Sequence, residues 1–88
     1  MIDRLESHGR LEMDFAGATV FARCRQEPGR LIIDHVEADP ALRGSGASGV
    51  FMTALAERAQ ARGERLRPVC GYAATWLRRH SAYAALIE

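Results

Sequence analysis

Three glycines within six residues, in the segment Leu42 to Gly49, constrain this chain more than any other feature. The segment lies between an extended apolar stretch and a run with helical spacing. Glycine lacks the Cβ that keeps a ligand away from the backbone, and the first turn of a helix leaves N–H groups unpaired at a dipole end of about +0.5 charge. The segment therefore predicts either a loop that binds an anionic group at a helix N-terminus or a merely flexible turn.

The glycine spacing also matches a dinucleotide fingerprint, because Gly44-x-Gly46-x-x-Gly49 has the form G-x-G-x-x-G. In that fold the first glycine follows a strand almost directly, and an acidic residue about 20 positions on, at the end of the next strand, holds a ribose. Here Asp39 to Arg43 intervene, and Glu64 precedes the next apolar segment, Leu66 to Cys70. This alternative is disfavoured, and the absence of lysine excludes the lysine-containing ATP loop.

Hydrophobic periodicity predicts an α+β fold with antiparallel strands first and a β-α-β unit after them. The expected strands cover residues 10–14, 18–25, about 30–38 and 65–69, with turns at Phe15-Ala16-Gly17 and Glu27-Pro28-Gly29. The expected helices cover about 46–62 and about 72–80, and Gly63 ends the first. The strand-helix-strand order requires the fourth strand to run parallel to the third through a right-handed crossover.

Each expected element has a face that the core would cover. The first helix has an apolar stripe of Phe51, Met52, Leu55, Ala56 and Ala59, and the last helix carries Ala73, Trp76, Leu77 and His80 at i, i+3, i+4, i+7 spacing. On the second strand Val20, Ala22 and Cys24 share one face, and Phe21, Arg23 and Arg25 the other. Strict alternation on the third strand places Leu31, Ile33, His35 and Glu37 on one face, and Ile32, Asp34, Val36 and Ala38 on the other.

Length and composition favour one domain over residues 1–88, with a loose lead-in over residues 1–8. The net charge of +1 argues against a nucleic-acid partner that works by counterion release, and no apolar run predicts a membrane span. Cys24 and Cys70 are expected as reduced thiols in a cytoplasmic protein. The three histidines show no metal-ligand spacing, so no metal is expected.

A second kind of pyrophosphate loop has the pattern Gln/Arg-x-x-Gly-x-Gly/Ala, and Arg43, Gly46 and Ser48 occupy its positions. Here the chain resembles the GNAT superfamily of acetyl-coenzyme-A-dependent N-acetyltransferases, specifically its small single-domain branch. That branch reads roughly His-Thr-x-Val-Pro-x-x-x-Arg-Gly-x-Gly-x-Ala, then a helix, then a strand ending in Pro-x-Cys-x-Tyr. The matching segments are His35 to Ser48 and Pro68 to Tyr72, and the resemblance covers about residues 10–83. This chain departs from the pattern at Val36, Pro40 and Ser48.

The resemblance implies a GNAT-like mixed sheet whose two parallel strands splay apart, with coenzyme A in the wedge and acetyl-CoA as the acetyl donor. The pantetheine arm would pair with the backbone of Val36, Glu37 and Ala38. The pyrophosphate would lie on Arg43, Gly44, Ser45, Gly46, Ala47, Ser48 and Gly49. The resemblance implies that His35 and Cys70 are the distinctive pair of this branch. From the chemistry of acetyl transfer, we expect His35 as general base and Cys70 as proton donor to the leaving thiolate or as a transient acetyl carrier.

Each candidate residue also has a purely structural alternative. His35 would be a hydrogen-bonded core histidine, Cys70 a packing residue, and Tyr72 a cap on the core or a proton donor. Glu37 is a weaker alternative base, and Arg78-Arg79-His80 could reach a phosphate or face water. At the level of function, the alternatives to an acetyltransferase are a non-catalytic coenzyme-A-binding module and an interaction domain without a small ligand. The acceptor amine, on a small molecule or a protein, and the oligomeric state are left open.

Overall fold

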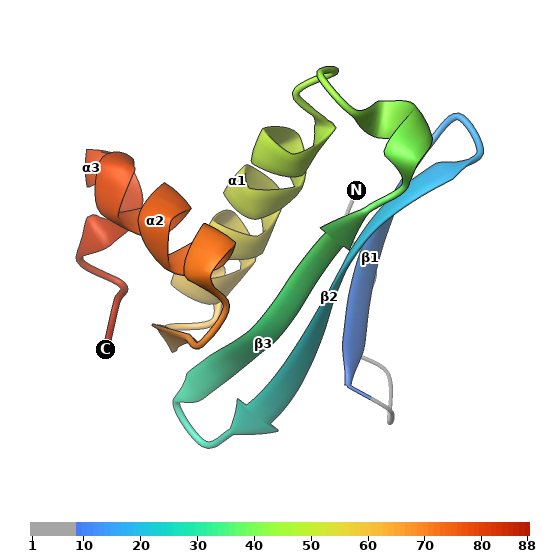
Figure 1. Cartoon of the computed structure of the whole chain (residues 1–88). Helices are drawn as coiled ribbons and strands as arrows, with labels where there is room; N and C mark the ends of the chain where they lie inside the picture. The colour runs from blue at the N-terminus through green and yellow to red at the C-terminus, as the bar shows by residue number, and fades with distance from the viewer. Residues whose placement is uncertain (1–8) are drawn as a thin grey trace.

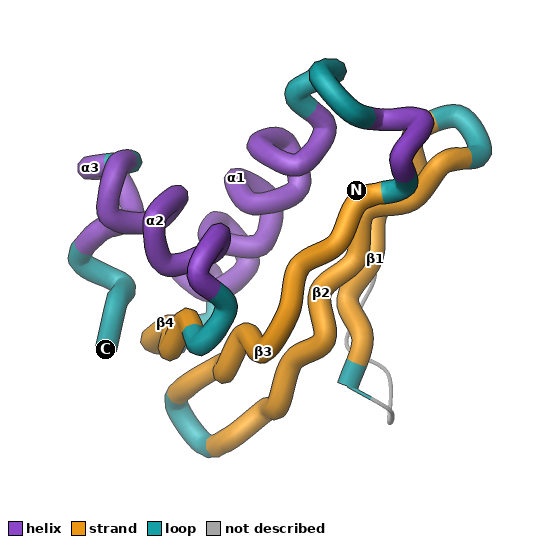
Figure 2. Tube along the Cα trace, in the orientation of Figure 1, coloured by secondary structure: helices purple, strands orange, loops and turns teal. Residues whose placement is uncertain are grey.

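The computed structural model describes residues 9–88, so the expected lead-in over residues 1–8 lies outside the described residues. A mixed four-stranded sheet has the order β1-β2-β3-β4, antiparallel except for the parallel pair β3 and β4 (Figure 2). The strands are β1 (Arg10–Phe15), β2 (Ala18–Glu27), β3 (Arg30–Ala38) and β4 (Arg65–Pro68). The helices are the 3-10 turn η1 (Pro40–Leu42), α1 (Ala47–Ala61), α2 (Gly71–Arg79) and α3 (Ser81–Ala84). The predicted α+β class and the β-α-β unit are confirmed.

Two-residue turns join the antiparallel strands. Ala16 and Gly17 both have positive φ, 53° and 93°, which gives the turn the twist that a tight hairpin needs. Pro28 and Gly29 form the second turn, where Gly29 has φ 76°. Because both loops are this short, β1 and β2 continue past their predicted ends, to Phe15 and Glu27.

The strict alternation predicted for β3 is wrong, because β3 has a bulge at Asp34. Arg23 lies opposite His35, but the next β2 residue, Cys24, lies opposite Ile33, which leaves Asp34 without a partner. An extra residue reverses the faces of all side chains beyond it. Arg25 Nε and Nη2 hold the two Asp34 oxygens at 2.8 Å each, and these hydrogen bonds lower the pKa of the Asp34 carboxyl.

The bulge determines which β3 side chains face the core and which face outward, and period-two spacing could not predict this division. Leu31 and Ile33 are fully buried in the core, and beyond the bulge Val36 and Ala38 pack against that same core. His35 and Glu37 therefore lie on the opposite side, which we call the outer face of the sheet. The outer face carries outward residues of all four strands: Arg10, Glu12, Phe21, Arg23, Arg25, Ile32, His35, Glu37 and Arg67.

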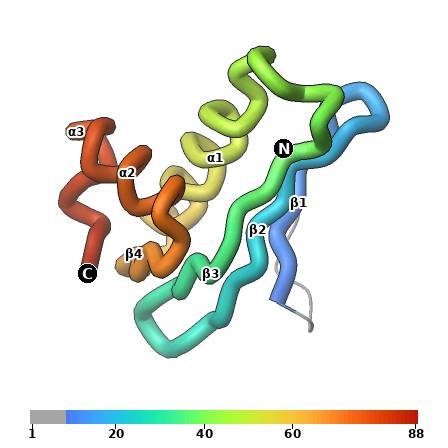
Figure 3. Tube along the Cα trace, in the orientation of Figure 1, coloured from blue at the N-terminus to red at the C-terminus, as the bar shows by residue number. Residues whose placement is uncertain are grey.

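Helices α1 and α2 lie together against the inner face of the sheet (Figures 1 and 3). The predicted α1 stripe of Phe51, Met52, Leu55, Ala56 and Ala59 is fully buried there, together with Val20, Ala22 and Cys24 of β2. The predicted end of this helix is also confirmed, because Gly63 follows the C-cap Arg62 with φ 66°. On α2, Ala73, Trp76 and Leu77 are buried as predicted.

His80 departs from its predicted place on the last helix. It lies one residue past the end of α2, where its ring stacks on Trp76 at a centroid distance of 3.7 Å. Its Nδ1 donates to the Trp76 carbonyl at 2.7 Å, since a carbonyl oxygen only accepts. The ring thus covers an edge of the core from outside.

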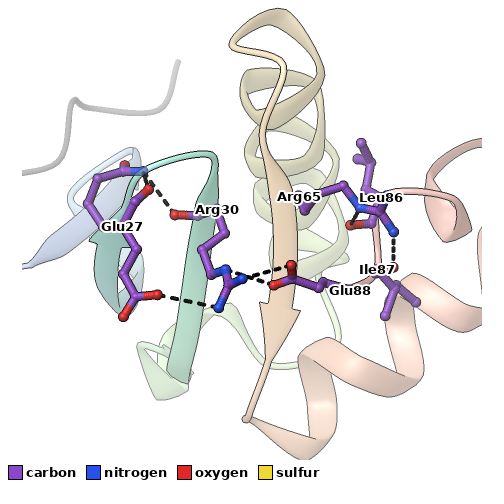
Figure 4. Close-up of polar contacts among 7 residues, drawn as sticks. Glu27, Arg30, Arg65, Leu86, Ile87 and Glu88 are labelled. Carbon is purple, nitrogen blue, oxygen red and sulfur yellow. Dashed lines mark hydrogen bonds and ion pairs between the residues drawn. The ribbon is translucent and has the colours of Figure 1, made fainter.

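The last three residues cover the edge of the short strand β4, which the sequence did not predict. Leu66 bridges to Ile87 in parallel, with its N–H donating to the Leu86 carbonyl at 2.8 Å. Arg30 Nε donates to Glu88 at 2.8 Å, and Arg65 donates to the Leu86 and Ile87 carbonyls (Figure 4). No helix within residues 9–88 has the length and apolar character of a membrane span.

Candidate cofactor-binding site

The parallel pair of strands separates after Ile33. Pairing between β3 and β4 ends at Ile33 and Pro68, and the N–H groups of Val69 and Cys70 both donate to the Ile33 carbonyl, at 2.9 and 3.0 Å. Beyond that point the chain turns into α2, while β3 continues through residues 34–38 beside β2 alone. Within residues 9–88 the other backbone edge of this part of β3 has no strand partner. The parallel strands therefore splay apart, as the resemblance implies.

Internal hydrogen bonds shape the glycine loop at the end of β3. Asp39 starts η1 by accepting the Ala41 N–H at its Oδ1, 2.9 Å away. The Leu42 carbonyl accepts both the N–H and the hydroxyl of Ser45, at 3.0 and 2.6 Å, and Ser45 Oγ in turn accepts the Ala47 N–H at 3.1 Å. The Ser45 side chain therefore holds the loop in shape.

Glycine is required where this loop enters α1. Gly44 and Gly46 have φ of 77° and 82°, and Gly46 is the N-cap of α1. A Cβ at either position would meet no atom of the described residues within 4 Å, so both face open space. Hydrogen bonds among residues 9–88 leave the N–H groups of Gly44, Gly46, Ser48 and Gly49 unused. Four free donors at a helix N-terminus are typical of an anion-binding site.

These donors line a cavity of about 420 Å³. Its wall consists of the end of β3, the loop, the first turn of α1 and one residue of α2: Ala38, Asp39, Pro40, Leu42, Arg43, Gly44, Gly46, Ala47, Ser48, Gly49 and Tyr72. Of the predicted cofactor residues, Val36, Glu37 and Ser45 are not in this wall. Val36 packs against the core beside the opening, whereas Glu37 lies on the outer face.

Four wall residues were not among the predicted cofactor residues: Asp39, Pro40, Leu42 and Tyr72. Burial raises the pKa of the Tyr72 phenol, and the Ser48 side chain that faces it lowers that pKa by a smaller amount. The charge of Cys70, two residues earlier, raises the Tyr72 pKa further. Tyr72 therefore lies between Ser48 in the first turn of α1 and Cys70 after β4. In the sequence, only the Pro-x-Cys-x-Tyr part of the motif indicated this tyrosine.

His35 and Cys70 lie on different sides of the opening. Cys70 is half-buried and packs against the core on the inner side, next to Tyr72. His35 lies on the outer face, where its Nε2 is 3.0 Å from Glu37 Oε1 and its ring meets the edge of Phe21 at a centroid distance of 6.4 Å. The side chain is 41% exposed, so the alternative of a core histidine is wrong.

The two cysteines are expected to differ in reactivity. Cys24 is 4% exposed, and burial raises the pKa of its thiol from 9.0 to about 12, which keeps it protonated and unreactive. Iodoacetamide at pH 8 should therefore modify Cys70 in the native protein and both cysteines in urea, as peptide mass spectrometry would show. Equal labelling of both in the native protein would contradict this placement.

The raised pKa of Cys24 also determines how the free energy of unfolding changes with pH. The folded state disfavours the thiolate, so the contribution of the protonated Cys24 thiol to the free energy of unfolding is fully present below the pKa of the unfolded chain, near 9. It is lost as pH rises from there toward the folded value of about 12. We expect Cys24→Ala to flatten the fall in unfolding free energy above pH 9, measured by urea titration.

A comparison with known protein families decides which fold family this geometry represents. The family model described as GCN5-related N-acetyl-transferase matches residues 10–86, nearly the whole chain. The chain belongs to the GCN5-related N-acetyltransferase family. A comparison with curated proteins gives no match. Membership of this acetyltransferase family agrees with the mixed sheet, the opening after Ile33 and the loop at the start of α1, and it supports acyl transfer as the general activity.

Proposed function

We propose that this chain is an N-acetyltransferase that uses acetyl-CoA as its acetyl donor. The observation that carries the proposal is the cavity of about 420 Å³ at the end of β3, whose wall includes unpaired N–H groups at the start of α1. Those donors would hold the pyrophosphate, and Arg43 in the same wall would add a positive charge. The unpaired edge of β3 over residues 34–38 would hold the pantetheine amides.

The chemistry needs a deprotonated amine and a protonated leaving group. Acetyl-CoA supplies an activated acetyl group as a thioester. His35 would take a proton from the acceptor nitrogen as that nitrogen bonds to the acetyl carbon. Cys70, on the other side of the opening, would give its proton to the sulfur as the carbon–sulfur bond breaks, and the proton taken up by His35 would then pass through water to Cys70 and restore both groups.

The placement of these two residues favours direct transfer over an acetylated cysteine. His35 faces the outer side and Cys70 the inner side, so an amine activated by His35 approaches the side away from Cys70. An acetyl group carried on Cys70 would lie on the core side of the sheet, behind β3. Direct attack needs no movement of the acetyl group between the two sides.

The outer face also bears on the acceptor. The helices of residues 9–88 pack on the inner face, so the surface around His35 is open and lacks a deep wall. An open surface accommodates an amine on a peptide or protein, which brings its own bulk, better than a small free amine that needs an enclosing pocket. We therefore propose a peptide or protein amine as the acceptor.

A turnover assay tests this function. Purified protein with acetyl-CoA would be offered peptides with free N-termini, peptides with lysine side chains, polyamines and amino acids, and acetylated products would be identified by mass spectrometry. Turnover of a peptide amine, lost in Cys70→Ala and kept in Cys24→Ala, is the expected result. Binding of acetyl-CoA with no product from any amine would instead identify a coenzyme-A-binding module without catalysis.

A further inference from the structure

The carboxylate of Glu37 has an unusual place on the outer face of the sheet. Two other acidic side chains of this face are paired with arginines, Glu12 with Arg10 at 2.8 Å and Asp34 with Arg25 at 2.8 Å, whereas Asp14 accepts the Gly17 N–H at 3.3 Å. Among the described residues Glu37 has no such arginine, and its one polar contact is His35 Nε2 at 3.0 Å. Its charge is therefore directed at the imidazole.

The bulge creates this pair. Residues two apart on a strand share a face, but without the extra residue at Asp34 both side chains would lie on the core side. Arg25 holds Asp34 by two hydrogen bonds and so fixes the bulge. Phe21 lies opposite Glu37 across the strand pair and places its ring edge against His35, which limits how the imidazole turns.

The contact also distinguishes the two ring nitrogens. An ionised carboxylate only accepts hydrogen bonds, so Nε2 of His35 is the donor in this pair. A neutral imidazole that carries its proton on Nε2 has its lone pair on Nδ1. Nδ1 is then the nitrogen that remains to accept a proton from another group.

We propose that Glu37 is a positioning residue for catalysis, which holds His35 by Nε2 and leaves Nδ1 to take the proton of the acceptor amine. This inference rests on the proposed function, in which His35 is the base. The charged groups around the imidazole are Glu37 on β3, Arg23 directly opposite on β2, and Asp34 in its pair with Arg25. Of these groups, Glu37 is the one whose side chain contacts the ring, through Nε2.

Two variants separate this role from a general effect of surface charge. Glu37→Gln removes the charge that faces His35, whereas Glu12→Gln removes a carboxylate on the other side of Phe21, on the same face but bound to Arg10. For Glu37→Gln we expect kcat/KM to fall about tenfold with the KM for acetyl-CoA unchanged. Glu12→Gln should leave the rate as in the unmodified protein.

Nitrogen NMR of the His35 ring gives a readout independent of turnover. The neutral ring of the unmodified protein should carry its proton on Nε2 and none on Nδ1, and Glu37→Gln should lower the share of this tautomer. An active protein in which Glu37→Gln changes neither the rate nor the tautomer, or in which Nδ1 carries the proton, overturns the inference alone. A change of tautomer in Glu37→Gln without turnover of any amine supports the pair and overturns the proposed function.

Discussion

Replacing Gly46 by valine is expected to weaken acetyl-CoA binding at least 100-fold, about 2.7 kcal/mol. Gly46 has φ 82° at the N-cap of α1 and belongs to the cavity wall, and a Cβ there would meet no atom of the described residues within 4 Å. A branched side chain there would occupy the place of the pyrophosphate and push the backbone away from its conformation. Isothermal titration with acetyl-CoA measures the affinity directly.

Backbone strain has to be separated from loss of the site, because valine at positive φ destabilises any turn. Gly63→Val is the matched control, since Gly63 has φ 66°, also faces open space, and lies beyond the opposite end of the same helix. Both variants should lower the thermal midpoint, whereas Gly46→Val alone should lose affinity. Equal affinity in the two variants would show that the glycine loop does not hold the ligand.

Replacing His35 by alanine is expected to lower kcat/KM for the acceptor about 100-fold or more, the usual range for loss of a general base. The affinity for acetyl-CoA should stay the same, because His35 lies on the outer face and outside the cavity wall. Stability should change little, since the side chain is 41% exposed. Steady-state kinetics with saturating acetyl-CoA separates these effects.

His80→Ala is the histidine control for this experiment. His80 stacks on Trp76 past the end of α2 and is absent from the cavity wall, so its loss should affect the thermal midpoint and leave the rate nearly unchanged. If His35→Ala turned over the acceptor as fast as His80→Ala, the base would have to be sought elsewhere on β3. Rescue of His35→Ala by added imidazole would support proton transfer as the missing step.

Local patterns predicted the order and type of nearly all the elements. The stripe from Phe51 to Ala59, the stop at Gly63 and the turn before Ala18 each depend on residues close in sequence, so spacing and glycine placement were sufficient. The loop from Arg43 to Gly49 was also found this way, because glycines between a strand and a helix have a direct physical meaning. Contacts between distant residues were not predictable in the same manner.

The bulge at Asp34 is the feature that made the predicted alternation of β3 side chains wrong. The sequence of β3 alone does not predict this bulge, because the bulge depends on how β2 and β3 pair and on the hydrogen bonds between Arg25 and Asp34. It nevertheless decides that His35 faces outward and meets Glu37. The β-bridge that the last residues form with β4 was missed for the same reason, since Leu66 and Ile87, like Arg30 and Glu88, are far apart in sequence.

The thermal midpoint of the purified protein with acetyl-CoA, and with NAD and ATP as parallel controls, tests the central claim most directly. A ligand at 100 times its dissociation constant adds about 2.7 kcal/mol, and in a domain of this size each kcal/mol moves the midpoint by roughly 4 to 8 °C. A rise of about 10 to 20 °C with acetyl-CoA alone is the expected result. No rise with acetyl-CoA, or a rise with NAD alone, would contradict the assignment of the loop from Arg43 to Gly49 as a coenzyme A site.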